Sequence, residues 1–442
     1  MARLSRTMRL AVVASSFVAF EGCTATGPLT RLTRVTSPYE RYVEALQDAG
    51  LHETALGRDW VAAGRQSLDR PTPVTLPFSE TGYFPAEAPE ARAFRFDAIE
   101  GRRLSLDVVF ESATPALVFL DLFEVRPGED GVHRVASLEP GTTTLTYAVD
   151  RSGSFIVRVQ SELLRSGRFV LTQRTLASLP FPVPDLTASA VQSLFGATRD
   201  AGRREHEGID IFASRGTPVV AVVSGIAQTG TTALGGNVVW LHEPGAGRTF
   251  YYAHLDRWAF DGTMTARPGD VLGYVGNTGN ARSTAPHLHF GLYARGAVDP
   301  LPYVLPDDPI PPAPQAPDRL GRFVRVSSRR ASLRAGPAPA TARVRELPQG
   351  TRAEVSGATA RAYRIRLPDD EVGYVDASAV TDATTAVGRQ RLDPGDVLLE
   401  SPEDSAPVVL TIADARDAEV LGRFGAYAFV RTPDGRSGWM AP

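Results

Sequence analysis

The chain has 442 residues, of which 43% are hydrophobic and 22% charged, and this predicts several globular domains rather than one compact core. The formal net charge of -3 lacks the strong basic bias of nucleic-acid-binding proteins, so nucleic acid is not an expected partner. The single cysteine excludes a disulfide framework within the chain.

Residues 1–23 have the pattern of a bacterial export signal. Arginines near the start precede an apolar stretch at 10–20, which is too short to span a bilayer in the usual way. Cys23 follows directly, and a lone cysteine at this point resembles the lipid-attachment site of bacterial lipoproteins. The resemblance implies export to the periplasm or cell envelope and lipidation of Cys23 as the sole link to the membrane. The alternative is an ordinary secretory signal that contains a cysteine.

Residues 24–69 are expected to form a tether and a short helical hairpin. Ser37 can cap a helix, Pro38 suits the first helical position, and Glu40 completes a capping box. A second short helix is predicted by the spacing of its apolar residues, which are Leu56, Trp60, Val61 and Leu68.

Residues 70–176 are expected to form an accessory β-sandwich. Polar and apolar residues alternate over short stretches that Gly, Pro and Asp separate, which predicts antiparallel strands. The predicted strands are 93–97, 104–108, 117–123, 144–149, 155–159 and 169–172. The run 147–159 resembles the pre-peptidase C-terminal family of β-sandwich modules, while the bare pattern also fits a jelly-roll or immunoglobulin-like module. His133 stands alone there, as a surface residue.

The segment 185–305 contains the residues that could bind a metal or catalyse a reaction, including most of the seven histidines. Side chains two apart on a strand point to the same face, so His287 and His289 can enter one site. On an extended chain, His206 and Asp210 also share a face, and a glycine between them leaves room. The flanking apolar residues would then point into a core.

Two histidines and one carboxylate form a sound ligand set for catalytic zinc. Zn²⁺ takes nitrogen and oxygen ligands tetrahedrally, and three protein ligands leave one position open for water. The metal lowers the pKa of that water toward neutrality and so supplies a nucleophile. The spacing alone leaves other metal sites open, including a mononuclear iron centre.

The whole segment resembles the LytM/lysostaphin family of zinc endopeptidases. The resemblance covers about 115 residues and rests on a combination of motifs in order. These motifs are Phe195-Gly196, His206–Ile211, Gly216–Ala221, Ser224–Ile226, Gly236–Val239, Tyr252–Leu255, Pro268–Asp270, Gly273–Gly279, Pro286–Phe290 and Asp299-Pro300. One departure is Gly291, which stands where the family usually has Glu.

The resemblance implies one zinc ion held by His206, Asp210 and His289. It also implies two catalytic histidines that are not ligands, His254 and His287. By analogy His287 is the general base and His254 orients groups or stabilises the oxyanion, although the two roles could be exchanged. The turn 276–279 is expected to matter for backbone geometry. His242 is expected to be structural.

Residues 306–319 are a proline-rich linker, which predicts a stiff spacer between domains. An internal repeat follows, in which Arg366-Leu367-Pro368-Asp369 recurs as Arg431-Thr432-Pro433-Asp434. The modules 320–383 and 390–442, of which the second is more divergent, resemble the bacterial SH3-like family. They are expected to bind wall peptides or a partner protein, or to serve as structural barrels.

The sequence therefore predicts a mainly β, multidomain protein. Its parts are a helical hairpin, a β-sandwich, an antiparallel LytM-like catalytic domain and two SH3-like barrels. The expected activity is zinc-dependent hydrolysis of stem peptides or cross-links of peptidoglycan. Two alternatives remain: a catalytically silent relative that activates another wall hydrolase, and an envelope protease that acts on proteins.

Overall fold

The computed structural model describes residues 36–199, 202–314 and 317–442. The predicted export signal, Cys23 and most of the tether lie outside the described residues. Within the described ranges, no helix has the length and apolar character needed to cross a membrane.

The predicted helical hairpin is present as α1 (Pro38–Asp48) and α2 (Ala55–Asp69). Tyr39 of α1 and Trp60 of α2 are buried, and their rings stack with centroids 5.1 Å apart. The Trp60 indole donates a hydrogen bond of 2.8 Å to the Ser161 carbonyl. Aromatic stacking, burial and this hydrogen bond therefore hold the hairpin against the strand that ends at Ser161.

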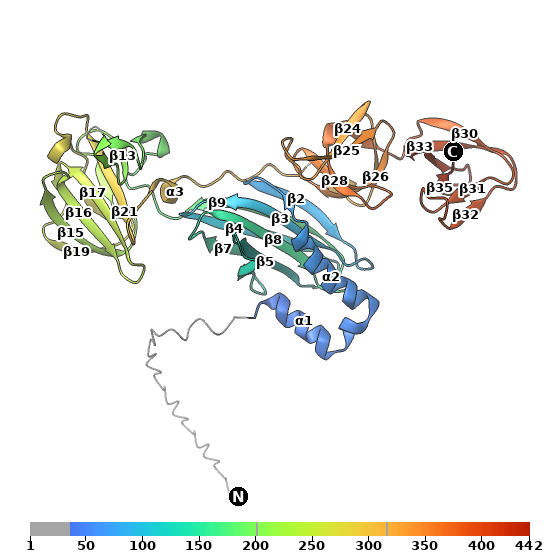
Figure 1. Ribbon diagram of the computed structural model, residues 1–442, viewed down its shortest axis with the longest axis horizontal. Helices are drawn as coiled ribbons and strands as arrows, with labels where there is room; N and C mark the ends of the chain where they lie inside the picture. The colour runs from blue at the N-terminus through green and yellow to red at the C-terminus, as the bar shows by residue number, and fades with distance from the viewer. Residues whose placement is uncertain (1–35, 200–201, 315–316) are drawn as a thin grey trace, which may run out of the picture. The chain divides into compact units, whose positions relative to one another are not determined.

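Two mainly antiparallel sheets follow, and residues of both form one hydrophobic core (Figure 1). The first sheet has, in spatial order, β1 (Thr72–Pro73), β3 (Ala91–Ala98), β8 (Gly153–Ser161), β5 (Val118–Val125) and β6 (His133–Ser137). The second contains β2 (Phe78–Phe84), β9 (Gly167–Ala177), β4 (Arg102–Glu111) and β7 (Thr144–Ala148). Each strand predicted from alternation is present, with small shifts at its ends.

Alternation missed β2 and β6. In β2 the polar residues Ser79, Glu80 and Thr81 are buried next to the apolar ends of the strand, so its polarity does not follow a period of two. His133 lies in β6 and is half-buried, and its Nε2 is 2.6 Å from a carboxylate oxygen of Glu129. It has no contact with the histidines of the following segment among the described interactions.

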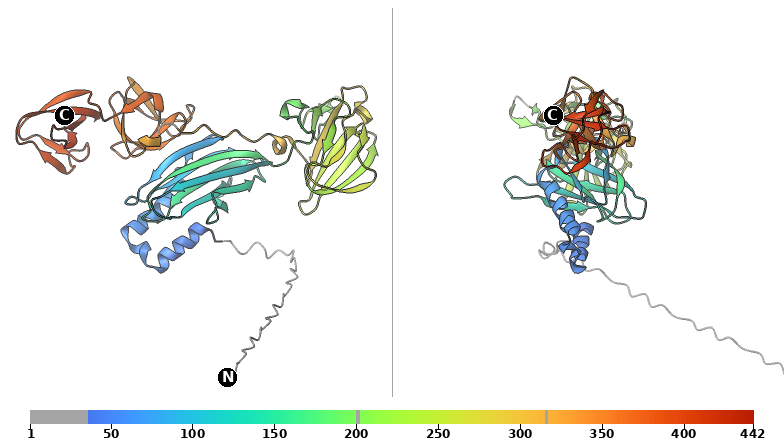
Figure 2. Two further views of the ribbon diagram at one scale, coloured as in Figure 1. Left: turned by 180° about the vertical axis from the view of Figure 1, so that it is seen from behind. Right: turned by 90° about the vertical axis from the view of Figure 1, so that its right-hand side faces the viewer.

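The next part of the chain folds around a larger antiparallel sheet (Figures 1 and 2). Its order is β10 (Val191–Ser193), β13 (Ile209–Phe212), β21 (His287–Tyr293), β17 (Arg248–Leu255), β16 (Gly236–Glu243), β15 (Gly225–Thr232) and β19 (Thr263–Ala266), and β22 (Ala297–Val298) pairs with β21. Smaller pairings join β11 (Thr198–Arg199) to β12 (Arg204–Glu205), and β14 (Pro218–Val220) to β20 (Val271–Tyr274) and β18 (Arg257–Trp258). The short helix α3 (Leu301–Val304) ends this part.

The C-terminal part contains two separate hydrophobic cores. Around the first lie β23 (Phe323–Val326), β24 (Arg330–Arg334), β25 (Arg343–Pro348), β26 (Arg352–Ala358), β27 (Ala362–Arg366), β28 (Val372–Asp376) and β29 (Val380–Asp382). Around the second lie β30 (Gly388–Leu392), β31 (Val397–Leu399), β32 (Val408–Thr411), β33 (Arg416–Phe424), β34 (Tyr427–Arg431) and β35 (Ser437–Met440).

The internal repeat of the sequence is also a repeat of strand pairing. Glu354 lies opposite Arg366 in the first unit, and Glu419 lies opposite Arg431 in the second. A register shift follows at the same offset in both pairs of strands. The repeated residues therefore fix equivalent positions in two units of similar local structure.

Candidate metal centre

The strand register places the predicted site residues side by side. Asp210 of β13 lies directly opposite His289 of β21, and Ala253 of β17 lies on the other side of His289. Ile209 and Leu288, whose side chains point the opposite way, are fully buried in the core of this sheet. One face of three neighbouring strands thus carries the polar residues, as the sequence pattern predicts.

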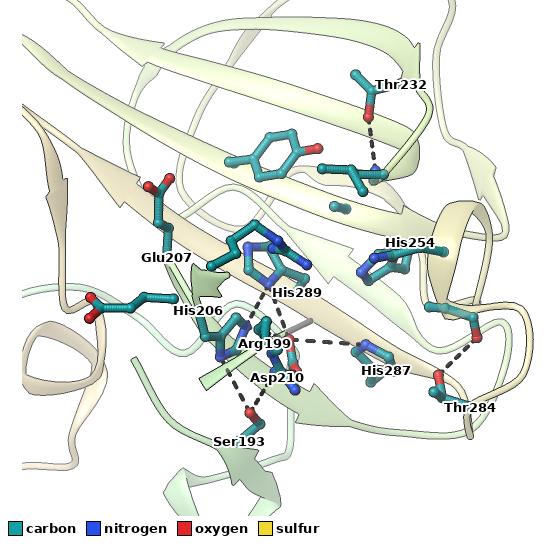
Figure 3. Close-up of a pocket in the computed structure, with 18 of the residues that line it drawn as sticks. Ser193, Arg199, His206, Glu207, Asp210, Thr232, His254, Thr284, His287 and His289 are labelled. Carbon is teal, nitrogen blue, oxygen red and sulfur yellow. Dashed lines mark hydrogen bonds and ion pairs between the residues drawn. The ribbon is translucent and has the colours of Figure 1, made fainter. Parts of the chain in front are cut away.

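Three ligand atoms converge on this face (Figure 3). His206 Nε2 lies 2.9 Å from Asp210 Oδ1 and 2.9 Å from His289 Nδ1, and the latter two atoms are 3.1 Å apart. Ligands about 2.0–2.2 Å from a tetrahedral zinc ion lie roughly 3.3–3.6 Å from one another, slightly farther apart than these three atoms. The spacing and the nitrogen and oxygen donor set therefore fit one zinc ion.

The imidazole of His206 is oriented by the backbone. Its Nδ1 donates a hydrogen bond of 2.9 Å to the Leu194 carbonyl, which assigns the proton to Nδ1 and leaves Nε2 free as a donor atom for a metal. This carbonyl was not predicted, because a backbone partner leaves no mark on the spacing of side chains.

The two carboxylate oxygens of Asp210 have different partners. Oδ1 faces the histidines, while Oδ2 accepts a hydrogen bond of 2.6 Å from Arg199. Burial alone would raise the pKa of Asp210, but the neighbouring His206 and His289 outweigh burial and hold this pKa well below its usual range. The carboxylate is therefore ionised and directed at the cluster.

Arg199 is a positioning residue that sequence reasoning missed. It lies on the short β11–β12 hairpin, and it also donates a hydrogen bond of 2.6 Å to the Ser193 hydroxyl. The hairpin reaches the cluster through tertiary contacts. The periodicity of the sequence therefore does not indicate that Arg199 contacts Asp210. By holding Oδ2, the guanidinium favours a metal contact through Oδ1 alone.

Replacing Arg199 by Met is expected to weaken zinc affinity by about tenfold to a hundredfold, because residues that orient metal ligands typically contribute that much. Arg199→Lys should retain part of the affinity, since it keeps the charge but loses the planar fork. Competition with a fluorescent zinc chelator measures both. Arg295, which is exposed and outside the cavity lining, provides the control as Arg295→Met, and equal affinities in all variants would contradict the assignment.

A second pair of histidines lies beside the cluster. The rings of His254 and His287 are 5.0 Å apart, and His287 Nε2 is 4.0 Å from Asp210 Oδ1. The Nδ1 atoms donate hydrogen bonds of 2.9 Å to the carbonyls of Thr278 and Ala285 respectively. These bonds assign the tautomers, so both Nε2 atoms are acceptors of hydrogen bonds.

His254 occupies a β-bulge. Leu255 pairs with Asn237 and Tyr252 pairs with Val239, so β17 has one extra residue at this point. His254 itself has a φ of 63°, in the left-handed region that non-glycine residues rarely adopt. The bulge turns its side chain toward the cluster, and such local strain is typical of functional positions.

The loop 276–279 fixes the bulge, as the expected role in backbone geometry requires. The Thr278 hydroxyl donates to the Leu255 carbonyl at 2.8 Å and accepts from the Asn237 amide at 3.0 Å. Its carbonyl, as described above, holds the ring of His254. One loop residue thus orders both the strand and the imidazole.

The pKa of His254 predicts a pH effect on the metal-free protein. Burial, and then the neighbouring His287, lower this pKa to about 4. Between pH about 6.5, where an unfolded histidine begins to bind a proton, and pH about 4, the unfolded chain holds more protons than the folded one. Stability should fall across this window as pH decreases, with no further loss from this group below it. Urea unfolding curves at several pH values measure this loss of stability, which should be smaller in His254→Gln. An unchanged pH dependence in the variant would show that His254 is not its cause.

Gly208 provides the room that the sequence predicts between His206 and Asp210. A Cβ atom at this position would lie 2.5 Å from the Phe290 carbonyl oxygen and 2.8 Å from Cε1 of His289. Gly208→Ala is therefore expected to displace His289 and to lower zinc affinity by about tenfold or more.

A matched control for this variant is Gly230→Ala in β15, because a Cβ there meets only an ordinary contact of 3.7 Å. Zinc titration of both variants by calorimetry tests the effect. Wild-type affinity in Gly208→Ala would show that the gap between the strands is not needed.

A cavity of about 780 Å³ opens over the cluster. Its lining includes all five of the residues singled out by the sequence, namely His206, Asp210, His254, His287 and His289. His242 is not in the lining: it is exposed, and its Nδ1 lies 3.0 Å from the Thr249 hydroxyl. His242 therefore lies outside the cavity that His206, His254, His287 and His289 line.

Curated proteins of known activity resemble this part of the chain. The L-Ala--D-Glu endopeptidase of Bacillus subtilis is 35% identical over 140 residues, which cover 28% of this chain and 42% of that protein. The DD-carboxypeptidase/endopeptidase Mpg of Neisseria meningitidis is 37% identical over 115 residues, which cover 26% of each chain. Lysostaphin of Staphylococcus simulans is 36% identical over 106 residues, which cover 22% of this chain and 21% of that protein. This chain spans less than half the length of these relatives.

Among solved structures, the catalytic domain of lysostaphin from Staphylococcus simulans is 32% identical. The match covers 25% of this chain and 87% of that domain, with a TM-score of 0.23. The model of peptidase family M23 matches residues 204–300, which contain the whole histidine and aspartate cluster. Residues 204–300 of this chain are a domain of peptidase family M23.

Proposed function

We propose that this chain is a zinc-dependent endopeptidase that hydrolyses peptide bonds of bacterial peptidoglycan. The observation that carries the proposal is the convergence of three metal-ligand atoms and two further histidines in one cavity. The names of the relatives support it, since they include an L-Ala--D-Glu endopeptidase and a glycyl-glycine endopeptidase. These names specify different peptide bonds.

In this proposal one zinc ion is held by His206 Nε2, Asp210 Oδ1 and His289 Nδ1. A bound zinc ion would polarise the scissile carbonyl and acidify water in the cavity. The buried, ionised Asp210 and the backbone-held His206 keep the ligand atoms together before the metal arrives. Little rearrangement is then needed on binding.

His287 would act as the general base. Its Nε2 is an acceptor and lies 4.0 Å from Asp210 Oδ1, beside the ligand cluster. It would take a proton from the attacking water and return it to the leaving amine. His254, also an acceptor at Nε2, would orient that water, and it could donate to an oxyanion only after gaining a proton.

The proposal is tested with purified peptidoglycan and the full chain. Soluble muropeptides should appear with the zinc-loaded protein, disappear with a chelator, and return with added zinc but not with magnesium. Mass spectrometry of the products would name the bond. A zinc-loaded protein that releases no muropeptide would contradict the proposal and would favour the silent activator of another hydrolase.

We further propose that the chain works in the cell envelope, held there by a lipid on Cys23, because peptidoglycan lies outside the cytoplasm. The repeated C-terminal units, each with its own core, would be SH3-like modules that bind wall peptides. A Cys23→Ser variant should move from the membrane fraction to the soluble fraction. Binding of wall peptides that survives deletion of 384–442 would argue against a role for the second unit.

A further inference from the structure

One wall of the cavity is an aromatic row that the proposed reaction does not use. It consists of Tyr251, Trp240 and Tyr293, which are half-buried and line the cavity. Tyr251 lies 5.8 Å from the ring of His289, Trp240 lies 4.1 Å from Tyr251, and Tyr293 lies 5.9 Å from Trp240, all between ring centroids. The three rings therefore form a continuous series of contacts that begins beside His289.

A carboxylate stands at the far end of this row. The Tyr293 hydroxyl donates a hydrogen bond of 3.3 Å to Glu207, whose side chain is exposed to the cavity. In Figure 3, Glu207 and Thr284 lie on opposite sides of His289, so the cavity extends past the cluster in both directions. Glu207 thus lies on one flank of the position where a scissile bond would be held.

Gly291 is buried between the Glu207 backbone and the aromatic row. Gly291 follows His289 on the same face of β21, and a Cβ there would lie 3.1 Å from the Glu207 carbonyl oxygen and 3.1 Å from the Tyr293 ring. A larger residue at this position would displace the Tyr293 ring or the Glu207 backbone. Gly291 therefore lets the aromatic row and Glu207 lie close together.

Glu207 places a negative charge at this flank of the cavity. No arginine among the described residues forms an ion pair with Glu207, and Arg199 is already bound to Asp210. Arg204 and Glu205, which carry opposite charges, also line the cavity. Burial, and after it the charge of Glu207, raise the pKa of Tyr293 to about 12, so its hydroxyl remains a donor at neutral pH.

We infer that Glu207 and the row Tyr251–Trp240–Tyr293 form a subsite for an ammonium group of the substrate peptide, next to the bond that is cleaved. A carboxylate combined with the faces of aromatic rings is the arrangement that attracts a cationic amine. The inference rests on the proposed function and narrows its substrate class to peptides with an amine near the scissile bond. Two sources share this chemistry, the side chain of a diamino acid and a free chain terminus.

The test measures binding of three synthetic tetrapeptides to the metal-free full chain by calorimetry, so that no turnover is needed. The first peptide has an acetylated terminus and a lysine at its third position, and the second differs only in having ε-acetyl-lysine there. The third has the acetyl-lysine and a free terminus. Wild type should bind at least one amine-bearing peptide about tenfold more tightly than the fully acetylated one.

Glu207→Gln should abolish this preference, because it removes the charge and keeps the shape. Asp261→Asn, which removes one exposed carboxylate of the same part of the chain outside the cavity lining, should retain it. A preference for the lysine peptide identifies a side-chain amine as the source, and a preference for the third peptide identifies a chain terminus. Equal binding of all three peptides, or a preference that survives in Glu207→Gln, would overturn the subsite.

The outcome is independent of the proposed activity. A chain that discriminates between the peptides but releases no muropeptide when loaded with zinc would refute the endopeptidase and leave the subsite. A chain that cleaves peptidoglycan but binds the peptides equally would refute the subsite and leave the endopeptidase.

Discussion

Replacing His206 by alanine is expected to lower zinc affinity by about a hundredfold and to reduce peptidoglycan hydrolysis to background. A structural zinc site with four protein ligands has an apparent binding free energy of about 10–16 kcal/mol, or roughly 3 kcal/mol for each ligand. A loss of that size at one of the three ligands here is about a factor of 100. The loss should be larger at His206 than at an average ligand, because its backbone bond to Leu194 fixes the ring before the metal binds.

The measurement is zinc content by atomic emission after dialysis, together with muropeptide release. His242→Ala is the matched control, since His242 belongs to the same sheet but lies outside the cavity. Full zinc content and full turnover in His206→Ala would show that this residue is not a ligand.

The second large effect is expected at His287, where a substitution should reduce activity without removing the zinc ion. His287→Gln should keep one zinc ion per chain, because the ligand atoms that converge in one cluster are those of His206, Asp210 and His289, and His287 is not among them. The turnover number should fall by about a hundredfold to ten-thousandfold, which is the usual contribution of a general base. Zinc analysis and steady-state kinetics on the same preparation separate the two effects.

His254→Gln provides the comparison for this variant. If His287 is the base and His254 orients the water, the second variant should lose less activity than the first. A larger loss at His254 would exchange their roles. Loss of zinc in His287→Gln would show that His287 is a metal ligand rather than a general base.

Much of the candidate site was predictable because it lies on regular strands. A period of two fixes which side chains share a face, so His287 and His289 could be placed together and Leu288 could be placed in the core. The same logic required a small residue between His206 and Asp210. The assignment of metal roles also depended on family resemblance, since spacing alone does not identify the ion.

The parts that could not be predicted depend on irregular backbone or on tertiary contact. The bulge that turns His254 requires one extra residue on β17, and nothing in the sequence of that strand announces it. Arg199 reaches Asp210 from a separate hairpin. The aromatic row joins three strands, and each of its members alone is an ordinary half-buried strand residue.

The same distinction applies to the rest of the fold. Strands with clear alternation, such as β3 and β8, were located to within a few residues. The strand β2 was missed because it buries Glu80 among other polar residues. The repeat at the C-terminus could be read directly, since the spacing from Glu354 to Arg366 returns as the spacing from Glu419 to Arg431.

The most direct test of the central claim is anomalous diffraction at the zinc edge from crystals of the full chain grown with zinc. We expect one strong peak within bonding distance of His206 Nε2, Asp210 Oδ1 and His289 Nδ1, with His254 and His287 facing it but not bound. A peak ligated by His254 or His287 in place of one of these three, or no peak in this cavity, would contradict the account.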